Sequence, residues 1–367
     1  MIAKPNYERS ILSIAASVLK HFGVKDCQHK TLPEFDELLS KDYKNIIVML
    51  FDGLGVSAIN EHLNENDFLR KHFVCPISSV FPSTTVAATT AIETGYSPIE
   101  SAWLGWDLFF EEIGENVSIF RNTLQRNGEP AAEYHVAGKY IPVKRIWDRI
   151  SAADKDIRTE CVSPFSQYKS QSVADICSEV CRIADENGRK YIYSYWHQPD
   201  TEMHIHGVSS IQAREQIELI NREVERLCGK LQNSLVIITA DHGLRDSKSE
   251  YFEDYPELLS MLKYPPSIEP RALSLFVKDG MQTEFAEKFN SIFGDSFLLM
   301  TKHEVYAERL FGSGVPHKHT DGFIGDFLAV ATGDITLFNF REDYEFIGVH
   351  AGMTEDEMLV PFIAVET

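Results

Sequence analysis

The sequence lacks any apolar run as long as a membrane-spanning helix, which needs about 20 consecutive apolar residues. It also lacks an excess of basic residues: 35 Lys and Arg stand against 55 Asp and Glu, and the formal net charge is -20. Nucleic-acid polymers and anionic membrane surfaces repel such an acidic chain. We therefore expect neither of them as a partner, although a local pair of metal ions could still attract an anionic small molecule.

The sequence also contains no Cys-x-x-Cys motif, and we expect no signal peptide. Of the six cysteines, Cys177 and Cys181 are one helical turn apart. This spacing is more typical of half-buried thiols on a helix than of metal ligands. The first 23 residues mix apolar and charged positions, as an amphipathic helix does, and have no signal-peptide core or cleavage site. We expect a reduced, cytoplasmic protein, whose oligomeric state the sequence leaves open.

Two short apolar runs each end in an acidic residue that glycine follows closely. Residues 46–51 precede Asp52, and residues 235–240 precede Asp241. An unbroken apolar run of this length is typical of a strand that is buried on both faces of a parallel sheet. Ligands of such sheets bind outside the carboxyl ends of the strands, so we expect both acids on one rim. The sequence predicts an α/β fold with a mostly parallel central sheet flanked by helices.

A third pattern places hydroxyl groups at the start of a helix. Residues 82–85 read Pro-Ser-Thr-Thr, and Thr94-Gly95 marks the expected end of the helix. Hydroxyl residues cap the amino ends of helices well. The same ends attract phosphate, because their N–H groups and dipole favour negative charge. On this stretch alone capping is the simpler interpretation, and Thr85 becomes a candidate nucleophile only together with the acids and histidines that follow.

The segment 191–207 supplies a carboxylate and an imidazole at helical spacing. A strand pattern and a turn come first, and Asp200 and His204 are then four residues apart. One helical turn places both side chains on the same face, which suits a zinc ion. We expect His197 and His206 to support the site from outside or to lie on the surface.

Two further histidines complete the set. His242 directly follows Asp241, and His350 lies in a loop between two glycines. Three carboxylates and three imidazoles are enough to bind two divalent metal ions with positions left open. The residual positive charge would attract a phosphoryl group, and coordination would lower the pKa of a nearby hydroxyl. The candidate ligands are Asp52, Thr85, Asp200, His204, Asp241, His242 and His350.

The order of these motifs (Asp, Pro-x-x-Thr…Thr-Gly, Asp-x-x-x-His, Asp-His-Gly, Gly-x-His) resembles the alkaline phosphatase superfamily, and most of all its type I phosphodiesterase and nucleotide pyrophosphatase branch. The resemblance implies a hydrolase that acts on a small phosphate ester or nucleotide through a phospho-threonine on Thr85. It also implies two zinc ions, which manganese could replace. Their implied ligands are Asp200, His204 and His350 for one ion, and Asp52, Asp241 and His242 for the other, with Thr85 bridging both.

One position departs from the family pattern. Where nucleotide pyrophosphatases carry an asparagine that holds a phosphate oxygen, this chain has Trp106, followed by Asp107. Neither side chain donates hydrogen bonds as an amide does, apart from the single indole N–H, but both are candidates for substrate contact. The motifs are therefore also compatible with a hydrolase of phosphonates or phosphate monoesters, similar to phosphonoacetate hydrolase. A non-catalytic, metal-stabilised scaffold is a more distant alternative.

The segment 245–340 differs in character from the rest and is predicted to form an inserted, cap-like subdomain. It alternates strand-like and helical patterns, as a small α+β unit does. Residues 1–244 and 341–367 would together form the metal-binding core. The inserted segment also contains His317 and His319, but a polar loop beside glycine and proline is more often exposed than metal-binding.

Overall fold

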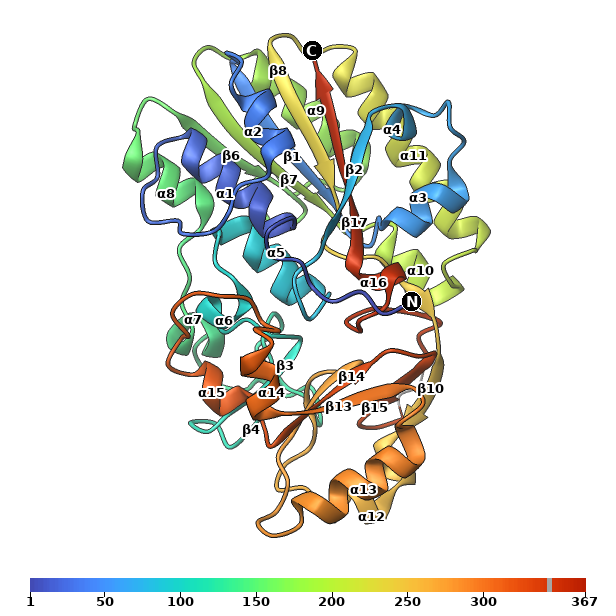
Figure 1. Ribbon diagram of the computed structural model, residues 1–367. Helices are drawn as coiled ribbons and strands as arrows, with labels where there is room; N and C mark the ends of the chain where they lie inside the picture. Colours follow the sequence, from blue (N-terminus) through green and yellow to red (C-terminus); the bar gives the residue numbers. More distant parts are fainter. Residues whose placement is uncertain (342–344) are drawn as a thin grey trace.

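The computed structural model describes residues 1–341 and 345–367, which form two lobes (Figure 1). The larger lobe is built on a six-stranded sheet, in which β1, β6, β7 and β8 run parallel and β17 runs antiparallel to both of its neighbours. This arrangement confirms the predicted α/β class with a mostly parallel central sheet. In spatial order the strands are β2 (Phe73–Ser78), β17 (Leu359–Glu366), β8 (Ser234–Thr239), β1 (Asn45–Phe51), β7 (Lys190–Trp196) and β6 (Arg158–Val162).

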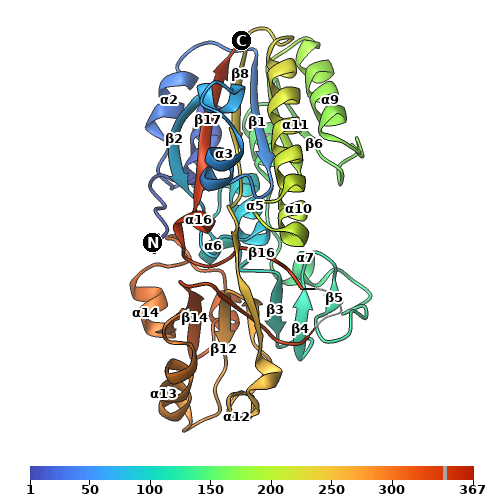
Figure 2. The same ribbon diagram turned by 90° about the vertical axis from the view of Figure 1, so that its right-hand side faces the viewer.

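Helices cover both faces of this sheet, which explains why its central strands are continuously apolar. Every residue of β1 and β8 is buried. Figure 2 shows α9 and α11 on one side of the sheet and α2 on the other. The helices that pack against α1 (Ile11–His21) are α2 (Pro33–Leu39), α5 (Thr85–Thr94) and α8 (Ile146–Ala153). Those that pack against α11 (Ile211–Cys228) are α3 (Val56–His62), α4 (Phe68–Lys71), α9 (Val173–Asp185) and α10 (Asp200–His206).

The smaller lobe is built on a seven-stranded sheet whose neighbouring strands all run antiparallel. In spatial order they are β13 (Phe297–Thr301), β14 (Phe327–Ala331), β12 (Ala272–Leu275), β11 (Ser267–Glu269), β3 (Asp107–Phe110), β4 (Glu115–Ser118) and β5 (Thr123–Leu124). The sheet thus joins strands of the segment 245–340 to strands from residues 107–124, which the sequence did not indicate. The predicted division at residues 245 and 340 stays a prediction, and residues 342–344 of the predicted core lie outside the described part of the chain.

Short elements complete the described fold. None of its helices combines the length and the hydropathy that crossing a bilayer requires. The short helices are α6 (Pro98–Ser101), α7 (Val136–Tyr140), η1 (Phe252–Asp254), α12 (Pro256–Leu259), α14 (Lys302–Ala307), α15 (Thr320–Phe323) and α16 (Glu355–Met358), and α13 (Gln282–Phe293) is longer. The remaining strands form two pairs, β10 (Lys248–Tyr251) with β15 (Ile335–Phe338) and β9 (Arg245–Asp246) with β16 (Gly348–Val349).

The register of the parallel strands brings their carboxyl ends to one level. Phe51 at the end of β1 pairs with Trp196 at the end of β7, and its neighbour Leu50 pairs with Thr239 at the end of β8. The chain therefore leaves all three strands at the same edge of the sheet, which faces the smaller lobe (Figure 1). The β9–β16 pair brings the segment around Val349 to this edge, because Val349 pairs with Arg245, six residues after the end of β8.

A fully buried ion pair connects the two lobes next to this edge. Arg271, between β11 and β12, donates from Nε to Glu357 Oε1 (2.6 Å) and from Nη2 to Oε2 (2.9 Å). Glu357 also accepts hydrogen bonds from the backbone N–H of Gly352 and the hydroxyl of Thr354. Burial raises the pKa of Glu357, but Arg271 and these hydrogen bonds lower it below its usual range. The pair thus fixes the loop that follows β16.

Removing one partner of this pair would leave a buried charge without compensation. We expect Arg271→Ala to lower the free energy of unfolding by about 3–5 kcal/mol, measured by urea denaturation. Arg182→Ala is the control, because Arg182 pairs with Glu179 and Glu186 on the surface and should cost at most about 1 kcal/mol. Equal losses in the two variants would contradict a structural role for the Arg271–Glu357 pair.

Candidate metal centre

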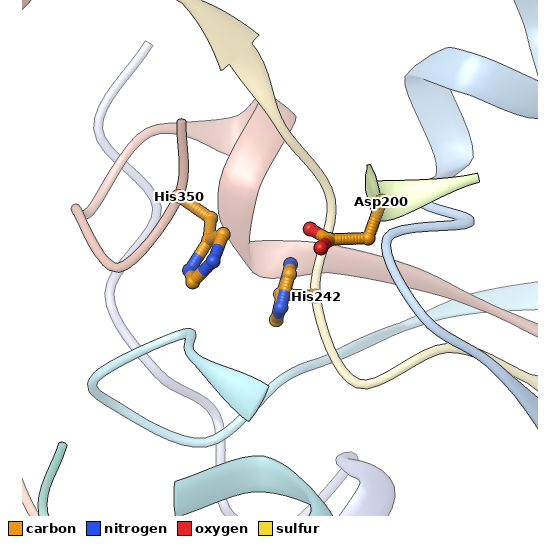
Figure 3. A group of neighbouring side chains, drawn as sticks. All are labelled: Asp200, His242 and His350. Atoms are coloured by element: carbon orange, nitrogen blue, oxygen red, sulfur yellow. The ribbon is translucent and has the colours of Figure 1, made fainter. Parts of the chain in front are cut away.

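The structure brings the predicted ligands together at the shared edge of the strands. Two groups have ligand atoms that all lie within 4.8 Å of one another: Asp52, Asp241 and His242, and Asp200, His242 and His350. Figure 3 shows the Asp200 carboxylate directed towards the two imidazole rings of the second group. His204 belongs to neither group among the described residues, but its Nε2 lies 3.2 Å from Asp200 Oδ1.

The spacing of these atoms matches that of ligands around a common ion. Nε2 of His242 lies 3.3 Å from Asp52 Oδ1 and 3.5 Å from Asp241 Oδ2. Two ligand atoms bound tetrahedrally to zinc, each at about 2.0–2.1 Å, are about 3.4 Å apart. The side chains are therefore arranged as ligands of cations that they share.

Each of the three carboxylates also has one buried oxygen that is free to bind such a cation. Oδ1 of Asp52, Oδ1 of Asp200 and Oδ2 of Asp241 are buried and accept no hydrogen bond within the described structure. The other oxygens of two of these groups are occupied, since Tyr195 donates its hydroxyl to Asp52 Oδ2 (2.5 Å) and Gly53 donates its N–H to Asp241 Oδ1 (3.1 Å). A buried, unpartnered carboxylate oxygen is costly unless it is paired or binds a metal. The residues present thus fit two divalent metal ions.

Backbone carbonyls orient the three imidazoles. Nδ1 of His204 lies 2.6 Å from the carbonyl oxygen of Gly348, and Nδ1 of His350 lies 3.2 Å from that of Ser83. His242 makes a similar contact to the carbonyl of Gly243 at 3.1 Å. In each case Nδ1–H donates and Nε2 keeps its lone pair for a metal, which is the usual arrangement of histidine ligands.

The charges of the site require compensation. Burial raises the pKa of Asp52, and Asp241 and Asp200 raise it further. Burial also raises the pKa of Asp241, whereas it lowers the pKa of His350 well below its usual value. Burial opposes ionisation of Asp200 too, but His204, His350 and His242 together lower its pKa below the usual range. Divalent cations would stabilise all of these groups in their metal-binding forms.

Two glycines allow the loops at the site to approach each other. A Cβ on Gly243 would lie 2.1 Å from the carbonyl oxygen of Asp356, and a Cβ on Gly55 would lie 2.6 Å from Cα of Gly243. A larger residue at either position would separate the loops that follow β1 and β8. The glycines that follow the two predicted strands thus allow the close backbone contacts around the site.

Thr85 lies beside the candidate ligands at the amino end of α5. Its Oγ1 is 3.2 Å from His242 Nε2. The helix spans Thr85–Thr94 and ends at Gly95, whose φ of 72° is left-handed, as the sequence predicted. The N–H groups of its first turn have no acceptor within the helix, so this end of α5 favours an anion beside the Thr85 hydroxyl.

The two residues predicted to contact substrate lie in the smaller lobe. Trp106 is half-buried and packs edge-on against Phe120 with ring centroids 5.7 Å apart. Asp107 accepts hydrogen bonds from Ser118 of β4 and, at 2.9 Å, from Gln125 just after β5, so both of its oxygens have partners.

The other histidines lie outside the two ligand groups of the described chain. His206 contacts Glu202 at 3.5 Å and is exposed, and His197 packs against Trp196. His317 and His319 stack on each other in the smaller lobe. The exposed position of His206 agrees with the expectation from the sequence, whereas His317 and His319 are partly buried and not fully exposed.

Three residues of the site escaped the sequence analysis. Tyr195 donates a hydrogen bond to Asp52, but in the sequence its place among alternating aromatic residues indicated only a strand. Phe165 is 82% exposed, yet its ring lies 6.1 Å from that of Tyr195. Glu269 of β11 is buried and accepts hydrogen bonds from Thr84 and from the backbone of Trp106. All three residues are identified only by the folded chain: Tyr195 and Glu269 by their hydrogen bonds, and Phe165 by its exposed ring next to Tyr195.

Comparison with known proteins agrees with the predicted resemblance. Residues 46–350 match the family model described as type I phosphodiesterase / nucleotide pyrophosphatase. No curated protein matches the chain. Many solved structures share the fold, among them three examples at low sequence identity. One is an inactive variant of murine ectonucleotide pyrophosphatase/phosphodiesterase 5 in complex with AMP (15% identity, covering 89% of this chain and 88% of that chain, TM-score 0.64). The second is human ectonucleotide pyrophosphatase/phosphodiesterase 5 (16% identity, 88% of this chain and 87% of that chain, TM-score 0.65). The third is phosphonoacetate hydrolase from Sinorhizobium meliloti in complex with phosphonoacetate (17% identity, 88% of this chain and 90% of that chain, TM-score 0.66).

Replacing one ligand should separate metal binding from folding. We expect Asp241→Asn to weaken zinc binding at least about tenfold, because the loss of an outer contact alone costs 10–100-fold. The metal-free variant should be no less stable than the metal-free wild type, since Asn keeps the Oδ1 acceptor and removes a buried charge. Elemental analysis and thermal unfolding with and without zinc measure both effects. Asp279→Asn, on the exposed partner of Lys263, is the control, and full zinc content in Asp241→Asn would remove Asp241 from the ligand set.

Proposed function

The chain belongs to the type I phosphodiesterase and nucleotide pyrophosphatase family and is a hydrolase of phosphoester bonds, and we propose that it acts through Thr85 and two divalent metal ions. The observation that carries this proposal is the position of Thr85. Its hydroxyl lies beside His242, at the amino end of a helix, where candidate ligands from both groups converge. A scaffold without activity would not need a hydroxyl at this place.

The proposed ligands of one ion are Asp200, His204 and His350, and those of the other are Asp52, Asp241 and His242. The 3.2–3.5 Å spacings from His204 to Asp200 and from His242 to Asp52 and Asp241 support this division, and His242 lies close enough to Asp200 and His350 to contact both sets. Mixed nitrogen and oxygen ligands suit zinc, and manganese is the alternative. When bound, two such ions would lower the pKa of the Thr85 hydroxyl and offset the charge of the phosphoryl group.

In the proposed reaction, Thr85 Oγ1 forms a bond to phosphorus while the bond to the leaving oxygen breaks. The product of this step is a phospho-threonine and a free alcohol or nucleotide. Water then attacks the phosphorus and the bond from phosphorus to Thr85 Oγ1 breaks. One proton of the water restores the Thr85 hydroxyl, and the second product leaves with the other O–H of the water as a phosphate hydroxyl or its anion. The N–H groups at the start of α5 favour the charge that develops on the phosphoryl oxygens.

The role of Thr85 can be tested apart from metal binding. We expect Thr85→Ala to reduce hydrolysis of the p-nitrophenyl ester of thymidine 5′-monophosphate by at least about 10³-fold, because it removes the nucleophile. Zinc content should stay unchanged, since the six Asp and His ligands remain. Thr85→Ser, which keeps a hydroxyl, is the matched control and should retain part of the activity. An active Thr85→Ala variant would refute the covalent mechanism.

A nucleotide or another ester with a planar ring is the proposed substrate. The exposed ring of Phe165 stands next to Tyr195, whose hydroxyl binds the ligand Asp52. An exposed aromatic ring at the edge of a polar site is suited to stack on a planar group of a ligand. The similar murine protein was solved with AMP, which supports this choice. The similarity to a phosphonoacetate hydrolase supports a phosphonate substrate as the second candidate.

The contribution of Phe165 distinguishes the two substrate classes. We expect Phe165→Ala to raise KM for the thymidine ester about tenfold, within the range of about 1–3 kcal/mol that stacking on one base provides. Phosphonoacetate has no ring, so any hydrolysis of it should not respond to the change. Leu298→Ala, at an exposed apolar residue of β13, is the control. Faster hydrolysis of phosphonoacetate than of the ester by the wild type would favour the phosphonate alternative.

We also propose that the protein acts in the cytoplasm. All six cysteines are unpaired, as expected in a reducing compartment. Small phosphorylated metabolites, rather than polymers or membranes, are then the proposed partners.

A further inference from the structure

Three successive residues, 346–348, hold the proposed ligand His204. The ring of Phe346 packs against the imidazole, with ring centroids 4.6 Å apart and 51° between the ring planes. Ile347 donates its N–H to the carbonyl oxygen of His204 (2.8 Å), and His204 donates Nδ1–H to the carbonyl oxygen of Gly348 (2.6 Å). One short stretch of chain therefore fixes the backbone, the ring and the Nδ1 atom of His204.

Gly348 permits this stretch to lie directly on α10. A Cβ at this position would be 2.5 Å from the carbonyl oxygen of Met203 and 2.9 Å from its carbonyl carbon. A larger residue would push β16 away from the helix and break the contacts to His204. The close approach of the two backbones thus places the ring of Phe346 against the imidazole.

The two proposed ions differ in how well the protein covers their ligands. Asp52, Asp241 and His242 are buried, whereas Asp200, His204 and His350 are only half-buried. His204 also belongs to neither of the two compact ligand groups in the described part of the chain. The more exposed ion therefore depends most on groups that shield its ligands and keep them in place.

The ring of Phe346 is itself packed among other rings. It is half-buried and lies 6.4 Å from the ring of Phe338, the last residue of β15. Phe338 in turn lies 6.1 Å from the ring of Tyr251, at the end of the paired strand β10. Because these neighbours already restrict Phe346, its packing against His204 requires little further loss of side-chain entropy.

We propose that Phe346 positions His204 for metal binding and shields this ligand from water, and that it thereby sets the affinity of the ion assigned to Asp200, His204 and His350. Groups that pack around metal ligands fix the orientation of these ligands, and apolar groups among them control the access of solvent. This role of Phe346 rests on the proposed function, because it concerns one of the two proposed ions. Phe346 acts on the metal through His204 and is a positioning residue.

Competition with a chromophoric zinc chelator tests this role on the full chain, because it measures the affinity for each ion without any substrate. Phe346→Ala should weaken the binding of one of the two ions at least about tenfold, as the loss of an outer contact to a ligand does. The other ion should keep its affinity within about threefold, because its ligands do not contact Phe346. Phe346→Tyr keeps the ring and should bind both ions as the wild type does. Phe340→Ala, at a 41% exposed ring six residues earlier, is the control and should also bind both ions normally.

The affinities are compared at a temperature at which circular dichroism shows every metal-free variant to be folded, so that a general loss of stability does not contribute. Unchanged binding of both ions by Phe346→Ala would overturn the role of Phe346. Equal weakening of both ions, or the same weakening in Phe346→Tyr, would overturn it as well. If Phe346→Ala does not fold, Phe346→Leu replaces it, because leucine fills part of the space without a ring, and the same outcomes apply.

The zinc content of the wild type distinguishes this role from the proposed function. A wild type that binds fewer than two zinc ions would refute the two-metal part of the proposed function. Two bound ions whose affinities do not depend on Phe346 would leave that function intact and overturn only the role of Phe346.

Discussion

The main physical constraint on this structure is that three carboxylates lie close together at the carboxyl ends of its parallel strands. Asp52, Asp200 and Asp241 meet there, and each has a buried oxygen without a hydrogen bond in the described chain. The protein places imidazoles rather than lysine or arginine among them, with Nε2 atoms oriented by backbone carbonyls. Ionised carboxylates in such surroundings are costly unless cations compensate their charge, so the proposed metal ions would stabilise this edge of the fold.

The second lobe completes this site instead of only covering it. The buried Arg271–Glu357 ion pair attaches its sheet to the loop that follows His350. Glu269 from the neighbouring strand reaches the loops of Thr84 and Trp106. Because both contacts come from the β11–β12 region, a small shift of this sheet would alter the positions of the proposed ligand His350 and of the proposed nucleophile Thr85 together.

Local patterns in the sequence were sufficient for much of the fold and the site. The apolar runs before Asp52 and Asp241 predicted β1 and β8, because a doubly buried strand has to be continuously apolar. The helical spacing of Asp200 and His204 was also correct, since both lie on α10. These features depend on neighbouring residues only.

Features that depend on distant residues could not be predicted in this way. Strands 107–110 and 115–118 join the second sheet because Asp107 pairs with Ile268 of β11, about 160 residues later in the chain. The return of His350 depends on two-residue strands, which give no periodicity. The proposed ligands consequently extend from residue 52 to residue 350. A growing chain acquires the last of them only when residue 350 has been added, and any fragment that ends before this residue lacks part of the proposed metal centre.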